Sequence, residues 1–368
     1  MIGKVLLVLG SLVVSLIVAE LVSREVLYGA LAFQRNSVDE AMFFQPDPLT
    51  GWSHIQDFQG RFANPSEGYR ARVTIDKLGL RANGNGLADR LEGSPEILIL
   101  GDSNTVGFEV DDHETFAARL ERMLFERGCR YRVHNAGVRG YGTDQSYWHL
   151  LKLRRSIDPE LTIYMFTFND LMDNRTIKRL RKVYGKPAYA YERDHLELVK
   201  PKSLQLDRAY YAYIENHPDG YELIEGSSQG HLVDIGFFVK EHLALSNLML
   251  PLYYEYFDPR IELESQDDDQ LEMDLHVLEE LLLMMKANSR RFLLMEFPTG
   301  QTDFRLSSAM DLDDLGIEYL DLAPYFTPPV EQYRWATDVH WNELGHETAA
   351  RALLSELQET LCGGTGRS

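Results

Sequence analysis

The chain has 368 residues, of which 44% are hydrophobic and 26% are charged, a composition typical of a folded globular protein that excludes a disordered or collagen-like one. Its 37 Lys and Arg residues against 57 Asp and Glu residues give a formal net charge of −20. A chain this acidic lacks the positive field that attracts a phosphate backbone, so we expect no nucleic-acid partner.

An uncharged apolar run occupies Val5–Ala19, directly after Lys4. A membrane span needs about 20 apolar residues, and Ile2–Val22 reaches that length if Lys4 snorkels to the interface. A buried soluble helix would show a polar face, which this run lacks. A cleaved signal peptide is an alternative because Ala19 could precede a cut, but no Ala-x-Ala pattern is present, so we favour an uncleaved anchor. We expect residues 1–23 to be a membrane anchor or signal segment, with the rest of the chain periplasmic or on the cell surface.

Residues 24–93 are rich in pairs that favour turns, among them Asp47-Pro48 and Asn64-Pro65. Short alternating stretches such as Arg70–Ile75 indicate small strands rather than long helices. We therefore predict a β-rich lead-in segment that packs over the domain that follows it.

From about residue 94, short apolar runs alternate with amphipathic patterns. The runs typical of strands buried on both faces are Glu96–Leu100, Tyr131–Asn135, Leu161–Phe166, Phe292–Met295 and Ile317–Leu320. The expected helices are one with Phe116, Leu120, Met123 and Leu124 on one face and Asp112 as its cap, one through Leu271–Leu282, and one over Glu343–Leu357. Such alternation predicts an α/β domain with a parallel sheet, which binds ligands at the carboxyl ends of its strands.

The alternation breaks down between residues 175 and 270. We expect one α/β domain in two parts, 94–174 and 271–362, interrupted by an insertion over 175–270 that could cover the carboxyl edge of the sheet. The acidic run Asp267–Asp269 in this insertion lacks the spaced ligands and the glycine of a calcium loop, so we interpret it as a solvated surface.

Four polar clusters stand where strand ends or helix starts are expected. The first contains Ser103 directly after the first strand, and the second is the glycine-rich stretch around Gly140 after the second strand. The third contains Asn169 after the third strand, and the fourth, with Asp338 and His340, precedes the last helix. Because a doubly wound sheet brings its strand ends to one edge, we expect the four clusters to meet there.

Together these clusters supply the groups that acyl transfer requires. Ser103 would be the nucleophile, His340 the base that takes its proton, and Asp338 the carboxylate that orients the imidazole. The oxyanion would be bound by the backbone N–H groups of Ser103 and Gly140 and by the side-chain amide of Asn169. Each cluster taken alone is also compatible with an ordinary turn or helix cap.

In this order, the four clusters resemble the sequence blocks of the SGNH hydrolase superfamily of GDSL-like esterases and lipases. The resemblance covers roughly residues 95–174 and 272–358. It implies a three-layer α/β/α sandwich of flavodoxin-like type with about five parallel strands. It also implies the same roles for Ser103, Gly140, Asn169 and His340. The lead-in, with Asp47–Trp52 and Leu78–Arg81, resembles membrane-anchored bacterial members.

Two positions depart from the pattern of that superfamily. The third block has Thr167 where glycine is usual, and a β-branched residue there means that the backbone does not adopt a positive φ. The last block usually places its aspartate three residues before the histidine, whereas Asp338 lies two before His340 and Thr337 takes the usual place. The shorter spacing resembles the Asp-x-His-Trp motif of bacterial exopolysaccharide O-acetylation proteins, in which the motif precedes the serine.

We therefore expect an extracytoplasmic serine esterase or O-acyltransferase that acts on a small acyl group, above all acetyl, of a cell-surface or secreted polysaccharide. The 19 Tyr, 17 Phe and 4 Trp residues offer rings that stack on sugars. One alternative is a lipase or lysophospholipase acting on a lipid ester, which would need an exposed apolar groove for the long acyl chain. Another is a non-catalytic accessory protein that binds polysaccharide, which would often lack one of the catalytic parts.

Motifs of other chemistries are absent from the sequence. There is no phosphate-binding G-x-x-x-x-G-K-[ST] loop, no G-x-G-x-x-G after the first strand, no H-E-x-x-H metal pair, and Ser103 is not in a G-x-S-x-G elbow. We expect no cofactor and no metal, and we interpret His346 as structural. The two cysteines, Cys129 and Cys362, exclude a four-cysteine zinc site. Whether they pair, and whether the protein has partner chains, the sequence does not decide.

Overall fold

A five-stranded parallel sheet forms the centre of the computed structural model. The structure describes residues 2–28, 36–37, 43–47, 49–64, 67–178, 186, 188–192, 195–199, 243, 245, 249, 261–262, 270–297, 304–336 and 338–363. The strand order is β14 (Glu318–Asp321), β13 (Phe292–Glu296), β8 (Leu161–Phe166), β6 (Glu96–Gly101), β7 (Arg132–Gly137). Every neighbouring pair is parallel, so all five carboxyl ends lie at one edge. The predicted parallel sheet is confirmed, with strand bounds shifted by at most two residues.

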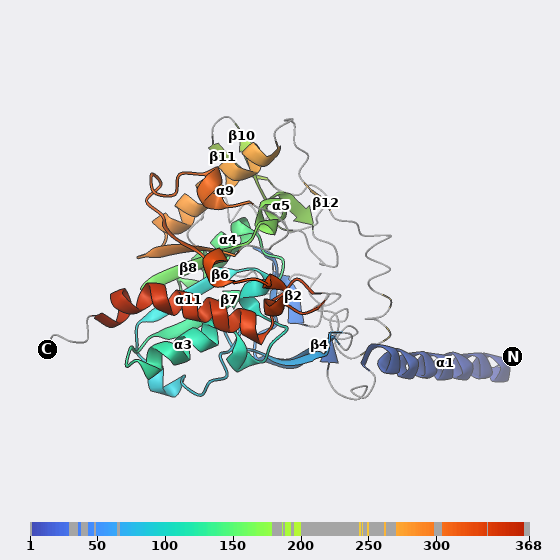
Figure 1. Cartoon of the computed structure of the whole chain (residues 1–368). Helices are drawn as coiled ribbons and strands as arrows, with labels where there is room; N and C mark the ends of the chain where they lie inside the picture. The colour runs from blue at the N-terminus through green and yellow to red at the C-terminus, as the bar shows by residue number, and fades with distance from the viewer. Residues whose placement is uncertain are drawn as a thin grey trace.

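Helices cover both faces of the sheet, as Figure 1 shows. The helices α3 (Phe116–Glu126) and α11 (Glu343–Cys362) pack on one face, and α4 (Thr143–Leu153) and α9 (Gln270–Ala287) on the other. The alternation of β6 explains the two layers, because Ile97 and Ile99 enter the core under α3 and α11 while Leu98 and Leu100 enter the core under α4 and α9. The predicted three-layer α/β/α sandwich is confirmed.

Shorter helices begin at the carboxyl edge or connect the layers. They are α2 (Ser103–Val106), α5 (Asn169–Arg175), α10 (Leu306–Ala309) and the 3-10 turns η3 (Asp89–Leu91), η4 (Asp112–Glu114), η5 (Ala323–Tyr325) and η6 (Val330–Tyr333). Two of them, α2 and α5, begin directly after β6 and β8, at the edge where the sequence places the candidate site.

The predicted cap of helix α3 was wrong. The N-cap is Thr115, whose hydroxyl accepts a hydrogen bond from the N–H of Ala118 at 3.3 Å. Asp112 instead accepts bonds from the backbone and the hydroxyl of Thr74, at 2.8 and 2.7 Å, and pairs with Arg81. The carboxylate of Asp112 therefore binds the lead-in segment, whereas the local sequence alone predicts that it caps α3.

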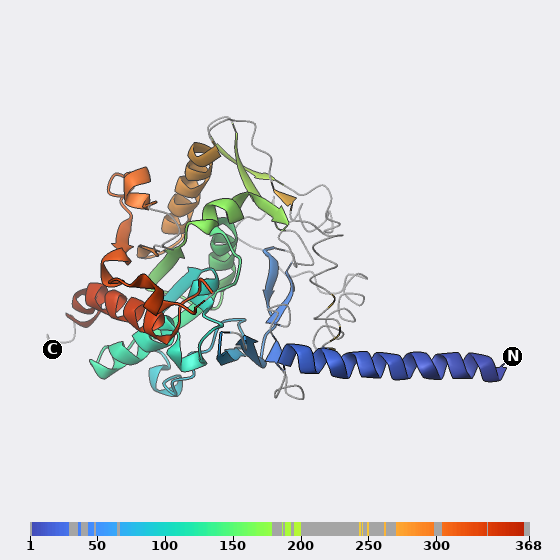
Figure 2. The ribbon, with the colours of Figure 1, turned by 45° about the vertical axis from the view of Figure 1, so that its right-hand side comes forward.

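The described part of residues 24–93 holds five short strands. These are β1 (Asn36–Ser37), β2 (Phe44–Asp47), β3 (Gly51–His54), β4 (Phe58–Asn64) and β5 (Tyr69–Ile75). This lead-in lies against the edge strand β7, where the N–H of Arg81 donates to the carbonyl of Asn135 at 3.0 Å. An aromatic cluster with Trp52, Phe62 and Phe108 joins it to the loop that follows β7, and Figure 2 shows the two side by side.

Within residues 175–270 the structure describes two antiparallel pairs. Strand β9 (Thr176–Lys178) pairs with β12 (Ile261–Glu262), and β10 (Ala188–Glu192) pairs with β11 (His195–Val199). The acidic run Asp267–Asp269 lies outside the described residues. That this segment is an insertion and roofs the site stays a prediction.

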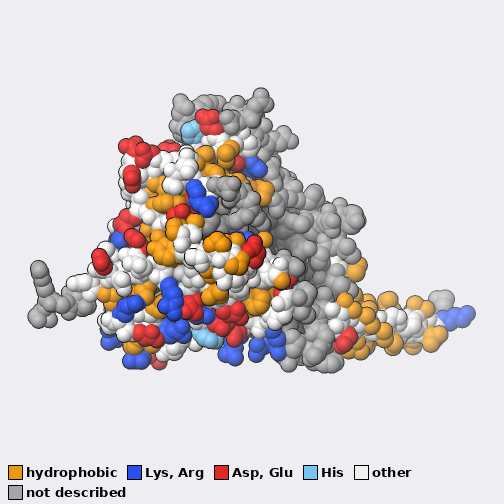
Figure 3. Space-filling view, in the orientation of Figure 1, with side chains coloured by type: hydrophobic (Ala, Val, Ile, Leu, Met, Phe, Trp, Pro, Cys, Tyr) orange, Lys and Arg blue, Asp and Glu red, His pale blue; other side chains and the backbone are white. Residues whose placement is uncertain are grey.

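The first helix, α1 (Ile2–Tyr28), points away from the rest of the chain (Figure 1). Its apolar part covers 24 residues, Gly3–Val26, and the large apolar side chains along it are exposed. At 1.5 Å per residue this is about 36 Å, enough to cross the roughly 30 Å hydrocarbon core of a bilayer. Figure 3 shows the apolar surface of this helix, which by length and composition suits a membrane anchor or a signal sequence.

A disulfide joins Cys129, just after α3, to Cys362, at the end of α11. Their Cα atoms are 5.3 Å apart although 233 positions separate them in the chain. The bond therefore links the two helices that cover one face of the sheet, and it answers the question of pairing that the sequence left open.

Replacing both cysteines by serine should lower the free energy of unfolding by about 2–5 kcal/mol, because the unfolded chain loses a long-range constraint. Urea unfolding of the full chain in detergent micelles measures this difference. Reductant should destabilise the wild type and leave the double-serine variant unchanged. Equal stability of the two proteins under oxidising conditions would contradict a structural disulfide.

Candidate active site

Ser103 follows strand β6, which lies between the central strand β8 and the edge strand β7, on a tight turn. Gly101 has a φ of +150°, and a Cβ atom there would lie 2.2 Å from the hydroxyl of Thr105, so only glycine fits this position. Asp102 then caps the short helix α2 by accepting the N–H of Asn104 at 3.0 Å. Ser103 is the first residue of this helix and is half-buried, which leaves it accessible at the carboxyl edge.

The imidazole of His340 is held by Asp338. The Oδ1 atom of Asp338 accepts both the ring Nδ1–H of His340 and its backbone N–H, the latter at 3.1 Å. In this turn an aspartate side chain accepts the backbone N–H of the second residue after it, so only one residue lies between the two. The spacing of Asp338 and His340, shorter than usual, therefore still orients the ring. Thr337, the alternative partner, lies outside the described residues.

The surroundings of Asp338 and His340 favour the charged form of both side chains. Burial favours the neutral form of Asp338, but the hydrogen bond and positive charge of His340 outweigh it and hold the pKa of Asp338 well below its ordinary value. Burial likewise favours neutral His340, and the charge of Glu109 together with the bond to Asp338 outweighs it, so the pKa of His340 is raised. The pair therefore favours an imidazolium beside a carboxylate.

Hydrogen bonds link the segments that carry Ser103 and His340. The backbone N–H of Trp341, next to His340, donates to the side-chain oxygen of Asn104, next to Ser103, at 3.4 Å. With Nδ1 turned to Asp338, the Nε2 atom of His340 is left for a substrate or a nucleophile. A direct hydrogen bond between Ser103 and His340 stays a prediction.

The two other predicted oxyanion residues also start from the carboxyl edge. Gly140 has a φ of +75° in the turn after β7, in which the N–H of Tyr141 donates to the carbonyl of Val138 at 3.1 Å. Asn169 begins α5 after β8, and its amide donates to the carboxylate of Asp102 at 3.3 Å and to that of Asp173 at 3.0 Å. The amide of Asn169 is therefore tied to the residue that precedes Ser103.

Thr167, which replaces the usual glycine, does not adopt a positive φ, as its branched side chain requires. Its hydroxyl donates to Asp102 at 3.0 Å, and its backbone N–H donates to Asp170 at 3.0 Å. The threonine thus adds a bond between the third block and the turn that carries the serine.

Sequence reasoning missed three residues of this site. Glu109, in the loop after α2, is buried with Oε1 against the guanidinium of Arg139 and 3.5 Å from Nδ1 of His340. The hydroxyl of Tyr69, in the lead-in, donates to Oδ2 of Asp338 at 3.2 Å. No motif marks Glu109 or Tyr69, whereas Arg139 stands beside Gly140 and could have been noticed as the charged member of that block.

Two other buried histidines, His346 on α11 and His149 on α4, differ from His340. His346 accepts the N–H of Phe116 on Nδ1 at 3.2 Å and stacks on its ring, which fits the structural role predicted for it. Burial lowers the pKa of His346 to about 3 and that of His149 also to about 3. Both rings are therefore neutral at physiological pH.

Three groups of the site are of the type that binds metals. Ligand atoms of Glu109, Asp338 and His340 all lie within 4.8 Å of one another. The guanidinium of Arg139 lies against Glu109, however, and Nδ1 of His340 is already hydrogen bonded to Asp338. A cation here would face the guanidinium of Arg139 and find Nδ1 of His340 already bonded, and we assign no metal site to these residues.

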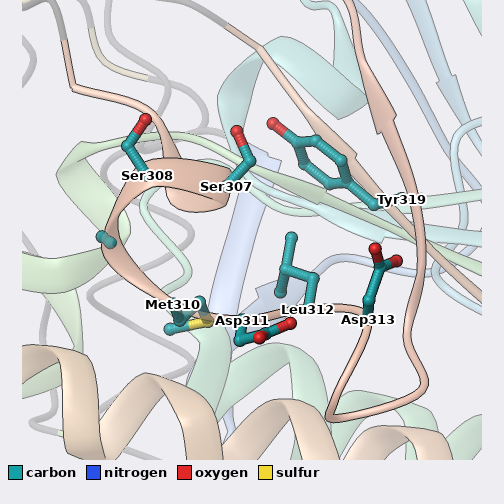
Figure 4. A pocket seen from close by; sticks show the side chains of 8 residues that line it. Ser307, Ser308, Met310, Asp311, Leu312, Asp313 and Tyr319 are labelled. Carbon is teal, nitrogen blue, oxygen red and sulfur yellow. The ribbon is translucent and has the colours of Figure 1, made fainter.

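A separate pocket of about 520 Å³ opens between α10 and β14. Figure 4 shows the hydroxyls of Ser307, Ser308 and Tyr319 on its rim. The Tyr319 hydroxyl donates to the buried carboxylate of Glu296. None of the five candidate catalytic and oxyanion residues lines this pocket.

Comparison with known proteins finds no matching family model and no matching curated relative. Solved structures that resemble the chain include TesA, with 12% identity, a TM-score of 0.39, and coverage of 72% of this chain and 99% of that one. A variant of Axe2, an acetyl xylan esterase from Geobacillus stearothermophilus, has 15% identity, a TM-score of 0.34, and coverage of 72% and 94%. A structure described as a lipolytic protein of the G-D-S-L family from Desulfitobacterium hafniense has 11% identity, a TM-score of 0.37, and coverage of 71% and 98%. At these values none of them assigns a role to a residue of this chain.

Titration by NMR of the full chain with isotope-labelled histidine rings should separate these environments. We expect His340 to titrate above its ordinary value of 6.5, and His149 and His346 to stay neutral down to about pH 3. Asp338→Asn should lower the pKa of His340, because the imidazolium loses an anionic partner. A midpoint of His340 below 6.5 in the wild type would contradict this description of the site.

Proposed function

We propose that this protein is a membrane-anchored, extracytoplasmic serine esterase or O-acyltransferase that forms an acyl-enzyme at Ser103. The proposed ester carries a small acyl group, above all acetyl, on a cell-surface or secreted polysaccharide. The observation that carries the proposal is the hydrogen-bonded pair of Asp338 and His340, joined through the Asn104–Trp341 bond to the turn that presents Ser103.

In the first step, Ser103 attacks the ester carbonyl while Nε2 of His340 takes its proton. Asp338 stabilises the imidazolium through Nδ1, and the N–H groups of Ser103 and Gly140 bind the oxyanion. The Asn169 amide, which donates to Asp102 and Asp173 in this structure, joins them when it turns to the substrate. The tetrahedral intermediate collapses when His340 gives its proton to the leaving alkoxide, which leaves an acyl-enzyme.

In the second step, a water molecule or a sugar hydroxyl attacks the acyl-enzyme, and His340 takes the proton of the attacking group. Collapse returns that proton to Ser103 and releases a carboxylic acid or a new ester. Hydrolysis and transfer thus use the same groups, and the accessibility of water decides between them.

Two features support a location outside the cytoplasm. Helix α1 is long and apolar enough to anchor the chain, and the Cys129–Cys362 disulfide is typical of oxidising compartments.

Aromatic rings beside the base support a carbohydrate substrate. Trp335 and Tyr69 lie with their ring centroids 5.0 Å apart, and the backbone N–H of Trp335 donates to the backbone carbonyl of His340 at 3.4 Å. Trp335 is half-buried, so part of its ring is left to stack on a sugar next to the reacting ester.

A lipid ester is the second candidate. Val339, between Asp338 and His340, is 48% exposed, and Leu344, at the start of α11, is 44% exposed. Exposed apolar side chains next to the base would suit an acyl chain held at a membrane surface. A lipase or lysophospholipase activity would show itself as a preference for long esters.

Removal of either central group should abolish the reaction. We expect Ser103→Ala and His340→Ala to lower kcat/KM on p-nitrophenyl acetate by at least about 1,000-fold. The wild type should prefer the acetate over the butyrate and octanoate esters. Ser355→Ala and His276→Ala, at exposed positions on α11 and α9, are the matched controls and should keep full activity. Equal rates for the wild type and Ser103→Ala would leave only a polysaccharide-binding accessory protein.

Substitution of Trp335 distinguishes a polysaccharide ester from a lipid ester as the substrate. If its ring stacks on a sugar, Trp335→Ala should lower kcat/KM on an acetylated polysaccharide such as acetyl xylan by about 3- to 10-fold. The rate on p-nitrophenyl acetate, which carries no sugar, should change little and serves as the control for folding. Equal losses on both substrates would contradict a sugar contact at this ring.

A further inference from the structure

The imidazole of His340 faces a second carboxylate besides that of Asp338. Oε1 of Glu109 lies 3.5 Å from Nδ1 of His340, the same ring nitrogen that is bonded to Asp338. The side chain of Glu109 is 1% exposed, and its other oxygen, Oε2, is buried with no hydrogen-bond partner. A buried carboxylate oxygen without a donor is costly, which points to a role beyond stabilising the fold.

We infer that Glu109 is a second positioning carboxylate of the active site, acting on His340 together with Asp338. This inference rests on the proposed function. Asp338 sets the orientation of the ring through a hydrogen bond, and Glu109 adds a negative charge from a different segment of the chain. Both charges stabilise the imidazolium that forms when Ser103 gives up its proton.

The backbone around Glu109 holds it rigidly. Its neighbours Phe108 and Val110 are 0% and 1% exposed. Phe108 belongs to the aromatic cluster that joins the lead-in to the loop after β7. A carboxylate fixed between two core residues needs little reorganisation when the charge on His340 changes, which is the condition for effective electrostatic stabilisation.

Among the described residues, the charged groups that face His340 act in both directions, and the two carboxylates outweigh the guanidinium of Arg139. The guanidinium of Arg139 lies against Glu109 and offsets part of its charge, and the hydroxyl of Tyr69 donates to Asp338. Farther out, Arg81 interacts with Glu109 from the lead-in, and it is itself paired with Asp112. The ring of His346, on α11, is neutral.

The charges close to the ring balance only when His340 is protonated. Glu109 and Asp338 carry two negative charges and Arg139 one positive charge, so the set is left with one excess negative charge. Protonation of His340 cancels this excess. Without Glu109, the charges of Asp338 and Arg139 would cancel each other. No negative charge would then remain to balance the imidazolium of His340.

The test compares two substitutions of Glu109 in the full chain in detergent micelles. Glu109→Gln keeps the shape and removes the charge, whereas Glu109→Asp keeps the charge. We expect Glu109→Gln to lower kcat on p-nitrophenyl acetate by about 10-fold or more. It should also move the acidic limb of the kcat/KM profile to lower pH by about one unit, because the imidazolium loses an anionic partner. Glu109→Asp should keep the limb near its wild-type position.

A second measurement does not depend on activity. The NMR titration midpoint of His340 should fall in Glu109→Gln in step with the kinetic limb. If the limb and the midpoint both stay at their wild-type values, Glu109 only anchors Arg139 and the inference is overturned. If instead Ser103→Ala is fully active, the proposed function fails while the titration still reports on the contact between Glu109 and His340.

Asp338→Asn offers a further test should Glu109→Gln fail to fold. Because Glu109 still faces the ring, this variant should lose less of kcat than the roughly 10⁴-fold that follows when a triad has no second carboxylate. Its remaining activity should keep an acidic limb. A loss as complete as that of His340→Ala would show that Glu109 contributes nothing to the function of the ring.

Discussion

The parallel pairing of the five central strands is the constraint on which the site depends. Parallel strands end at one edge, and β8, β6 and β7 are neighbours in that order from the centre outward. The turns that carry Ser103, Asn169 and Gly140 therefore meet, although more than 60 residues separate Ser103 from Asn169. Helix α11 then packs on α3 across one face, and the loop before it brings His340 to the same edge.

The carboxylates of this acidic chain become useful where they are buried and paired. Asp102 joins the serine turn to Thr167 and Asn169, Asp338 orients His340, and Glu109 faces the same ring. In each case burial makes the charge more effective than it would be in water. The net charge of −20 thus says little about the site, since the decisive charges are the few that the fold removes from solvent.

The lead-in segment forms part of this arrangement. The hydroxyl of Tyr69, in the lead-in, donates a hydrogen bond to Asp338. The indole N–H of Trp52 donates to the backbone carbonyl of Arg139 at 3.1 Å, beside Gly140. The contact of the lead-in with Asp112 also explains why that residue does not cap α3. The segment before the sheet therefore holds two loops that the proposed reaction needs.

The sequence by itself determined the fold class, the strand runs and the candidate residues at the strand ends, because each depends on local periodicity or on spacing along the chain. The tertiary structure decided which side chains contact those candidate residues. Glu109 and Tyr69 reach His340 and Asp338 from segments far away in sequence, and Cys129 pairs with Cys362 across 233 positions. Contacts of this kind follow from how layers pack on one another, and no pattern along a single strand or helix records them.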